Sequence, residues 1–351
     1  MGIISIQWVA KLEDNMRFLA QEAAEDVLDE MWWQDFARVI PSTSEVENFS
    51  WFVHSAVIED LGLGGQVNFR DMVMKQASFT NRYAGTGLSI PRAKFLDLDG
   101  HGIEAAAEWS TEMGIESQYW PQKAVATALK AGTASPGYDG QDFFSVAHPV
   151  NPGWAGLGTF ANYFTGGVSG AYPGACPIDT SVAADTALSN MAKVWTYIAG
   201  VKAANGTSPR NLRPWKMLVP PALVPRAAQL TDAKFLAQVA EAGKSAGTGD
   251  VSAIIQRLGF GTPVMAPELG AAFGGSDTTW YVLVKQAERS RLGAMTYVER
   301  EPFAVRYFTG DGGGDYTDAQ LDRMEEYEWH VKGRNTAGFG HPYLLFRVDA
   351  A

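Results

Sequence analysis

The sequence is poor in cysteine and in long apolar segments. Cys176 is the only cysteine among 351 residues, which excludes an intrachain disulfide and a zinc site built on several cysteines. Charged residues or glycine interrupt every apolar stretch well short of the roughly 18 residues that a membrane-spanning helix needs. The segment 1–8 (MGIISIQW) lacks the basic start of a secretory signal, and Ile6 breaks the myristoylation pattern. We therefore expect synthesis in a reducing cytosol.

Positive charge is also scarce. The chain has 28 Lys and Arg against 39 Asp and Glu, a formal net charge of −11. Tight, sequence-independent binding of nucleic acid needs a basic surface, so this balance argues against it. An acidic protein can still enclose DNA without adhering to it, and the same charge also fits ordinary solubility. Hydrophobic residues make up 46 % of the chain, which predicts a substantial folded core.

Catalytic motifs are missing as well. The chain has five scattered histidines: His54, His101, His148, His330 and His341. No two of them stand four residues apart and no HExxH occurs, so we predict that each lies at the surface or packs in the core. The stretch 167–170 (GVSG) resembles a nucleophile elbow around Ser169 but lacks its final glycine. We therefore predict no catalytic and no cofactor-binding residue.

Two acidic segments have some of the features of cation sites. Asp97, Asp99 and Glu108 stand at positions 1, 3 and 12 of an EF-hand spacing, but His101 at position 5 is a poor ligand for a hard cation. The alternative, which we favour, is a helix N-terminus whose acidic residues complement the helix dipole. The pair Asp311 and Asp315, separated by three glycines, could hold an ion, but a surface turn is the commoner use of such a loop. The prediction is therefore no metal site.

Residues 1–45 have a helical pattern. Leu12, Met16, Leu19 and Ala23 recur at helical spacing with acidic residues between them, and the polar breaker 41–44 (PSTS) follows. We predict a helical arm that is only weakly anchored to the rest of the chain. A helix packed on the core is the alternative.

The pattern then changes to alternation. Val67 and Phe69, and then Met72 and Met74, alternate with polar residues, and the same period returns at 88–90 after the break 85–87 (GTG). This predicts a long β-hairpin over about 66–96 with its tip at the glycines.

Two helices are predicted farther along. The first covers about 102–131, with a glycine cap at Gly132 and a kink or a break into two helices at Gly114 and Pro121. Residues 133–180 then form an extended insertion whose many aromatic side chains must pack. The second helix covers about 182–204.

The remaining elements alternate between strands and helices. We predict a strand at 217–219, a helix over about 221–230, a further helix ending near Leu258, and a strand at 280–284. Near the C-terminus, 327–331 and 344–348 alternate as half-buried strands. We predict that these two strands pair antiparallel across the turn at 338–340 (GFG). The fold class is α+β.

Several segments resemble the Mu-like prophage major head subunit (gpT-like) family. The most specific is 138–150 (YDGQDFFSVAHPV), which is similar to the family signature YDGQ-FF---HPV and follows a helix that ends at 128–132 (ALKAG). Five further segments resemble family motifs in the same order: 78–92, 112–121, 216–223, 260–283 and 328–340. The likeness covers roughly residues 46–348.

The resemblance implies the Hong Kong-phage capsid fold. In that fold the chain divides into an N-terminal arm (1–45), an E-loop (46–95), a peripheral (P) domain (96–180 and 300–351) and an axial (A) domain (181–299). It also implies a major capsid protein of the virion that is no enzyme and assembles with itself into a shell around double-stranded DNA. Scaffold, portal and decoration proteins are the expected partners, and the bacterial host cytoplasm is the expected place of assembly.

Three other functions stay open at this point. An encapsulin-like nanocompartment would share the fold but hold protein cargo. A metal-dependent or hydrolytic enzyme would use Asp97, Asp99 and Glu108, or Ser169. A tail or sheath component would form tubes instead of closed shells.

Overall fold

The computed structural model describes residues 6–53, 73–91, 101–167, 172–231, 260–285, 293–307 and 326–350. Two sheets organise these residues. The first is four-stranded, in the order β1 (Ala37–Pro41), β11 (Met295–Tyr307), β12 (Glu326–Phe339) and β4 (Arg82–Pro91). The second is five-stranded, in the order β7 (Tyr163–Phe164), β13 (Leu345–Val348), β10 (Trp280–Lys285), β8 (Arg213–Val219) and β9 (Val264–Met265).

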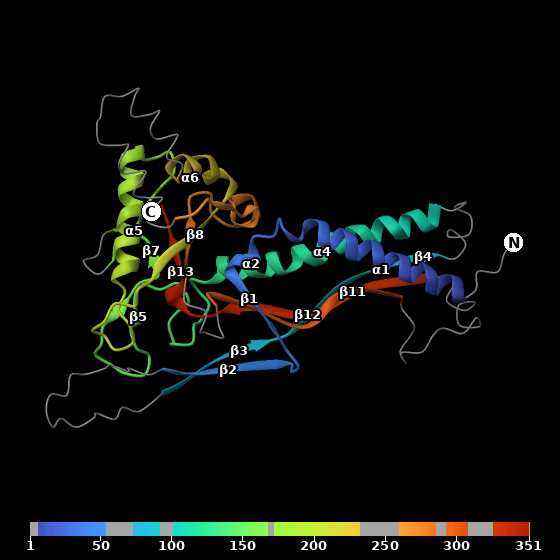
Figure 1. The fold of residues 1–351 in the computed structure, drawn as a ribbon, viewed down its shortest axis with the longest axis horizontal. Coiled ribbons are helices and arrows are strands. Elements are labelled where there is room, and N and C mark those ends of the chain that lie inside the picture. Colours follow the sequence, from blue (N-terminus) through green and yellow to red (C-terminus); the bar gives the residue numbers. More distant parts are fainter. Residues whose placement is uncertain are drawn as a thin grey trace.

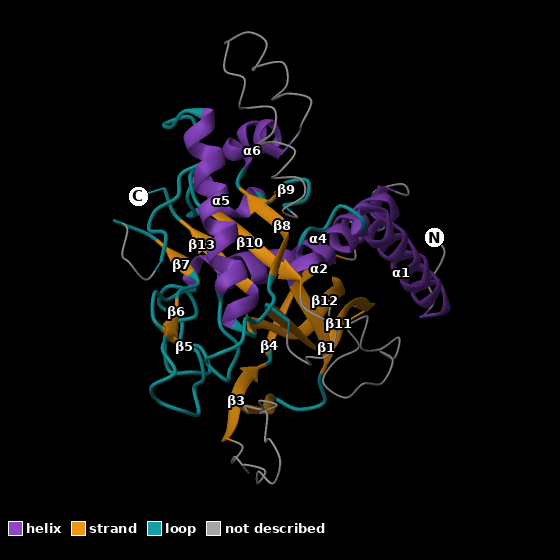
Figure 2. Cartoon of the chain, turned by 60° about the vertical axis from the view of Figure 1, so that its left-hand side comes forward, coloured by secondary structure: helices purple, strands orange, loops and turns teal. Residues whose placement is uncertain are grey.

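Each sheet has its own helices. Helices α1 (Ile6–Leu28) and α4 (His101–Ala131) run side by side along the four-stranded sheet (Figure 1). Helices α5 (Ala184–Gly200) and α6 (Val224–Thr231) cover the five-stranded sheet at the other end of the molecule (Figure 2). A two-stranded ribbon of β2 (Val46–Val53) and β3 (Val73–Thr80) extends beside the first sheet. A short pair, β5 (His148–Pro149) and β6 (Thr159–Phe160), completes the described strands.

Of the two outcomes predicted at Gly114 and Pro121, a kink or a break into two helices, the break is wrong. Helix α4 is continuous over 31 residues and contains both Gly114 and Pro121. Proline cannot donate the helical hydrogen bond, but one missing bond in a long helix packed on both sides is tolerated. The four-stranded sheet and α1 supply that packing.

The N-terminal segment is helical, as predicted, but it is not weakly anchored. Leu12, Met16, Ala20 and Ala23 are buried. Helix α1 packs closely on α4 because Gly114 has no side chain, and a Cβ atom there would overlap the Ala20 carbonyl group. Asp14 and Glu22, which stand between the apolar positions, are exposed on the outer face of α1 and so do not weaken its contact with α4.

The close approach of α1 and α4 at Gly114 leads to a testable prediction. Gly114→Ala should destabilise the subunit by about 1–3 kcal/mol, because the new methyl group forces α1 away from α4. At an ordinary helical position the same change stabilises, by roughly 0.5–1 kcal/mol. A fall in melting temperature would therefore support the close packing of α1 on α4 at Gly114, and a rise would contradict it. Thr127→Ala, on the exposed face of the same helix, is the control.

The predicted hairpin over 66–96 is also wrong. Strand β3 pairs antiparallel with β2, from Val46 opposite Thr80 to Val53 opposite Val73. Strand β4 instead pairs with β12 along its whole length. The expected tip is therefore the middle of β4, where a Cβ atom on Gly85 would overlap the Val331 carbonyl oxygen. Residues 66–72 lie outside the described residues.

The C-terminal strands alternate as predicted, but they do not pair with each other. Tyr327, Trp329 and Val331 on β12 are buried, and Lys332 is exposed. Strand β12 continues through Gly338 to pair with β11 and β4. Strand β13 instead pairs with β10 in the other sheet.

The largest core lies between the five-stranded sheet and its helices. The aromatic side chains of the 133–180 insertion contribute to it, as predicted: Phe143, Phe144, Phe160 and Phe164 are all buried. The strand predicted at 280–284 and the helix predicted at 182–204 are both present, as β10 and α5. Trp280 is fully buried, and its indole nitrogen donates to the Cys176 carbonyl at 3.1 Å. The helix predicted to end near Leu258 lies outside the described residues.

Candidate assembly elements and the buried His148 cluster

The signature segment 138–150 is organised around a buried histidine. His148 Nδ1 lies 2.6 Å from Asp139 Oδ2. Its Nε2 lies 3.0 Å from both the Phe143 carbonyl oxygen and Asn162 Oδ1. The side chains of His148 and Asp139 are 0 % and 2 % exposed, so this pair is sealed from solvent.

The neighbouring groups decide which atoms carry protons. The Asn162 amide nitrogen donates to the carbonyls of Phe143 and Pro342, at 2.7 and 3.0 Å. Asn162 Oδ1 therefore accepts, and it also accepts from the Ser145 N–H at 2.9 Å. Since both partners of Nε2 are acceptors, Nε2 carries a proton. A second proton lies between Nδ1 and the Asp139 carboxyl group.

This arrangement joins three distant segments. It ties the signature loop to residues around β6 and to the turn at Pro342 before β13. Both ring nitrogens are engaged and no solvent reaches them, so His148 is positioned to hold the fold together. The resemblance singled out Asp139 and His148, but nothing in the sequence pointed to Asn162.

The other sequence candidates are placed as follows. Glu108 is exposed on α4, whereas Asp97, Asp99, Ser169, Asp311 and Asp315 lie outside the described residues. Across the part of the chain that the structure describes, no three His, Cys, Asp or Glu side chains gather closely enough to hold a metal ion. His341 is buried against Tyr343, and burial lowers the pKa of His341 to about 4. Within the same described ranges, no helix is both long and apolar enough to cross a bilayer.

Large apolar side chains are exposed on several separate elements. Met74 on the β2–β3 ribbon is 60 % exposed, and Phe18 on the outer face of α1 is 64 % exposed. At the other end of the molecule, Met265 and Phe273 are 51 % and 63 % exposed. Exposed apolar groups on projecting elements are typical of surfaces that contact other chains.

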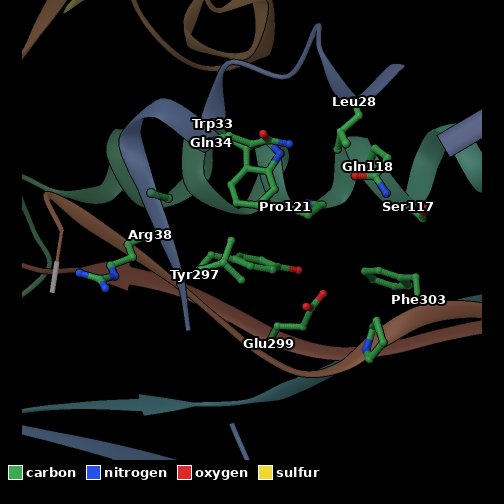
Figure 3. Close-up of a pocket in the computed structure, with 13 residues that line it drawn as sticks. Leu28, Trp33, Gln34, Arg38, Ser117, Gln118, Pro121, Tyr297, Glu299 and Phe303 are labelled. Atoms are coloured by element: carbon green, nitrogen blue, oxygen red, sulfur yellow. The ribbon is translucent and has the colours of Figure 1, made fainter. Parts of the chain in front are cut away.

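A cavity of about 620 Å³ lies where α2 (Trp33–Phe36) and β1 meet α4 and β11 (Figure 3). Trp33, Tyr297 and Phe303 line it together with Glu299. The sequence offered no sign of this cavity, because its walls come from the segment 28–39, from α4 and from β11, which are far apart in the chain.

Comparison with known proteins finds similarity to phage head proteins. Residues 11–173 match the family described as Mu-like prophage major head subunit gpT. The major capsid protein of Escherichia phage Mu is 28 % identical over 130 residues, which are 37 % of this chain and 41 % of the phage Mu protein. The alignment therefore spans less than half of that relative's length.

The architecture is shared with a solved phage capsid. The capsid of the Cyanophage P-SCSP1u aligns with a TM-score of 0.53 at 13 % identity, over 92 % of this chain and 88 % of that chain. The procapsid of bacteriophage JBD30 aligns with a TM-score of 0.49 at 18 % identity, over 99 % of this chain and 76 % of that chain. The chain is thus similar to the Mu-like prophage major head subunits over residues 11–173, and its α+β fold is that of capsid proteins of the Hong Kong-phage type.

Proposed function

We propose that this protein is the major capsid protein of a Mu-like tailed phage or prophage. Copies of it assemble into a closed icosahedral shell that encloses double-stranded DNA. The observation that carries the proposal is the coincidence of a phage capsid fold over most of the chain with the sequence match to the Mu-like head subunits. A subunit of this kind acts by repeating the same contacts with its neighbours until the shell closes.

The fold supports a division of the chain that differs from the sequence prediction at the E-loop and at β7 and β13, which lie in the five-stranded sheet. We assign the E-loop to about 46–80, because β2 and β3 form the ribbon and β4 belongs to the four-stranded sheet. That sheet with α4 corresponds to the P domain, and the five-stranded sheet with α5 and α6 corresponds to the A domain. Residues 1–45 take the place of the N-terminal arm.

The proposal extends to partners and location. The protein is a structural component of the virion that catalyses no reaction. It assembles in the bacterial host cytoplasm with the help of a scaffold, and it joins a portal and decoration proteins. The acidic balance suits a shell that encloses DNA without binding its sequence.

Expression of the chain, alone and with the phage's own scaffold, tests the proposal. Light scattering and negative-stain electron microscopy should show pentamers, hexamers or closed shells. Subunits that stay monomeric at 38 kDa under all of these conditions would count against it. Tubes would indicate a tail or sheath component, and shells packed with protein would indicate a nanocompartment.

A substitution on the ribbon separates folding from assembly. Met74→Glu places a charge where an exposed apolar side chain is expected to meet a neighbouring copy. The melting temperature of the unassembled subunit should stay within about 1 °C, because an exposed side chain contributes little to stability. Shell formation should be lost. Thr196→Glu, exposed on α5, is the control and should assemble normally. Normal shells from the Met74 variant would remove the ribbon from the assembly contacts.

A further inference from the structure

An exposed tryptophan in the five-stranded sheet lies among cations. Trp215 on β8 is 36 % exposed, although indole side chains are usually well covered. The Lys216 and Lys285 ammonium nitrogens lie 4.8 and 5.7 Å from the centroid of the Trp215 ring. Arg213 stands directly opposite Lys285 across β8 and β10, and both side chains are exposed. We call these four residues, Arg213, Trp215, Lys216 and Lys285, the basic patch.

Two cations of the basic patch have no anion within the subunit. Lys216 forms an ion pair with Asp35 of α2. Among the residues that the structure describes, neither Arg213 nor Lys285 forms an ion pair. Like charges that stand directly opposite each other in a sheet destabilise it, unless an anion comes close to both. In a chain with a net charge of −11, these two neighbouring cations therefore point to an anionic partner outside the subunit.

The same chain carries a surface of the opposite charge on α1. This helix has five acidic side chains against two basic ones, and one of the basic ones, Arg17, is paired with Glu13. Phe18 on its outer face is 64 % exposed. Asp14 and Glu22 stand four residues before and after Phe18, so the three exposed side chains follow one another along this face. We call Asp14, Phe18 and Glu22 the acidic stripe.

We infer that the basic patch of one subunit receives the acidic stripe of a second copy of the chain. Phe18 packs on the exposed Trp215 ring, and Asp14 and Glu22 neutralise the two cations that lack a partner. Within one subunit the two surfaces lie on different elements, since α1 runs along the four-stranded sheet and β8 belongs to the five-stranded sheet (Figure 1). Among the described residues, no ion pair and no ring contact joins them.

The chemistry of the two surfaces favours a second copy over a nucleic acid. Exposed aromatic rings surrounded by complementary charges are typical of the centre of a protein–protein contact. The backbone of double-stranded DNA offers phosphates but no exposed ring for Trp215, whereas the acidic stripe offers both carboxylates and a ring. Because the two surfaces differ, the contact runs from one copy to the next and can close a ring. The inference rests on the proposed function, because a shell subunit meets further copies of itself.

Reversal of the charges on both surfaces tests this contact. Arg213→Glu with Lys285→Glu should raise the protein concentration needed for assembly at least about tenfold, because like charges then face each other across the contact. Asp14→Lys with Glu22→Lys should have the same effect. The chain that carries all four substitutions should assemble at the wild-type concentration, because opposite charges face each other again.

A matched control separates the contact from a general effect of charge. Lys193→Glu with Lys202→Glu makes the same change in net charge at two exposed positions outside the basic patch, and this variant should assemble as the wild type does. All four reversed side chains of the contact are exposed, so the melting temperature of the unassembled variants should stay within about 2 °C of the wild type. Normal assembly of either two-fold variant would overturn the inference. Failure of the four-fold variant to assemble would assign the basic patch to another anion, such as a nucleic acid, and would also overturn it.

Sedimentation of unassembled subunits keeps the inference testable if the wild type forms no particles, a result that would refute the proposed function alone. The wild type should associate as its concentration rises, and this association should weaken between about 50 mM and about 500 mM NaCl, because salt screens exposed charges. The variant Arg213→Glu with Lys285→Glu should stay monomeric, and the four-fold variant should associate. A wild type that stays monomeric at every concentration, or association that the charge reversals leave unchanged, would overturn the inference.

Discussion

Replacing His148 with alanine should destabilise the subunit by about 3–5 kcal/mol. The change removes the partner of Asp139, whose side chain is only 2 % exposed, and so leaves a carboxylate buried without compensation. It also removes the donor to Asn162 and to the Phe143 carbonyl. Chemical unfolding monitored by circular dichroism measures the effect, and we expect most of the variant to be insoluble at 37 °C.

Asp142→Ala serves as the matched control for this cluster. Asp142 lies in the same loop but is exposed, so its loss should change the free energy of unfolding by about 0.5 kcal/mol or less. The double variant Asp139→Ala with His148→Ala should lose less than the sum of the two single losses, because each single variant leaves the other partner unpaired. Additive losses would mean that the two side chains do not act as a pair.

Trp329→Ala should cost about 3–5 kcal/mol as well, for a different reason. Trp329 is 1 % exposed and packs in a second, smaller core with Leu12 and Met16 of α1 and with Tyr327. The cavity left by an indole cannot close, because the sheet backbone and α4 hold the walls apart. Calorimetry of the unassembled subunit should show the loss, and limited proteolysis should show earlier cleavage within α1, which packs on this side chain.

Glu328→Ala is the control that tests which side chains of β12 face the core. Its side chain points to the opposite face of the strand and is partly exposed, so we expect a change of about 0.5 kcal/mol or less. Equal losses from Trp329→Ala and Glu328→Ala would show that the strand does not bury one face against α1.

The spacing of apolar residues predicted those helices and strands that can be recognised from neighbouring residues alone. Helix α5, strands β8 and β10, and the alternation of β12 were all visible in the spacing of apolar residues. A helix or strand that buries one face must repeat its apolar residues at that spacing, whatever it packs against. The fold type was predicted in addition, from motifs that resemble those of a known family and follow the same order along the chain.

The sequence did not show which strands pair or how firmly α1 is anchored, because both depend on segments far away in the chain. Gly85 was interpreted as a turn, but it is a glycine because the β12 backbone passes close to it. Alternation showed that β12 and β13 are strands without showing that they belong to different sheets. Gly114 suggested a break in α4, and its actual partner is the backbone of α1.

The sequence by itself determined the class of the protein: an α+β chain with one cysteine, an acidic balance, no recognisable catalytic motif, and the signature segment of a phage head subunit. Only the tertiary structure decided which strands pair, that α1 packs on α4, and that the cavity at Glu299 exists. It also brought Asn162 and the Pro342 carbonyl to the signature pair of Asp139 and His148. The physical reason is that apolar spacing is a property of neighbouring residues, whereas a buried hydrogen bond or a cavity needs side chains from several distant segments at once.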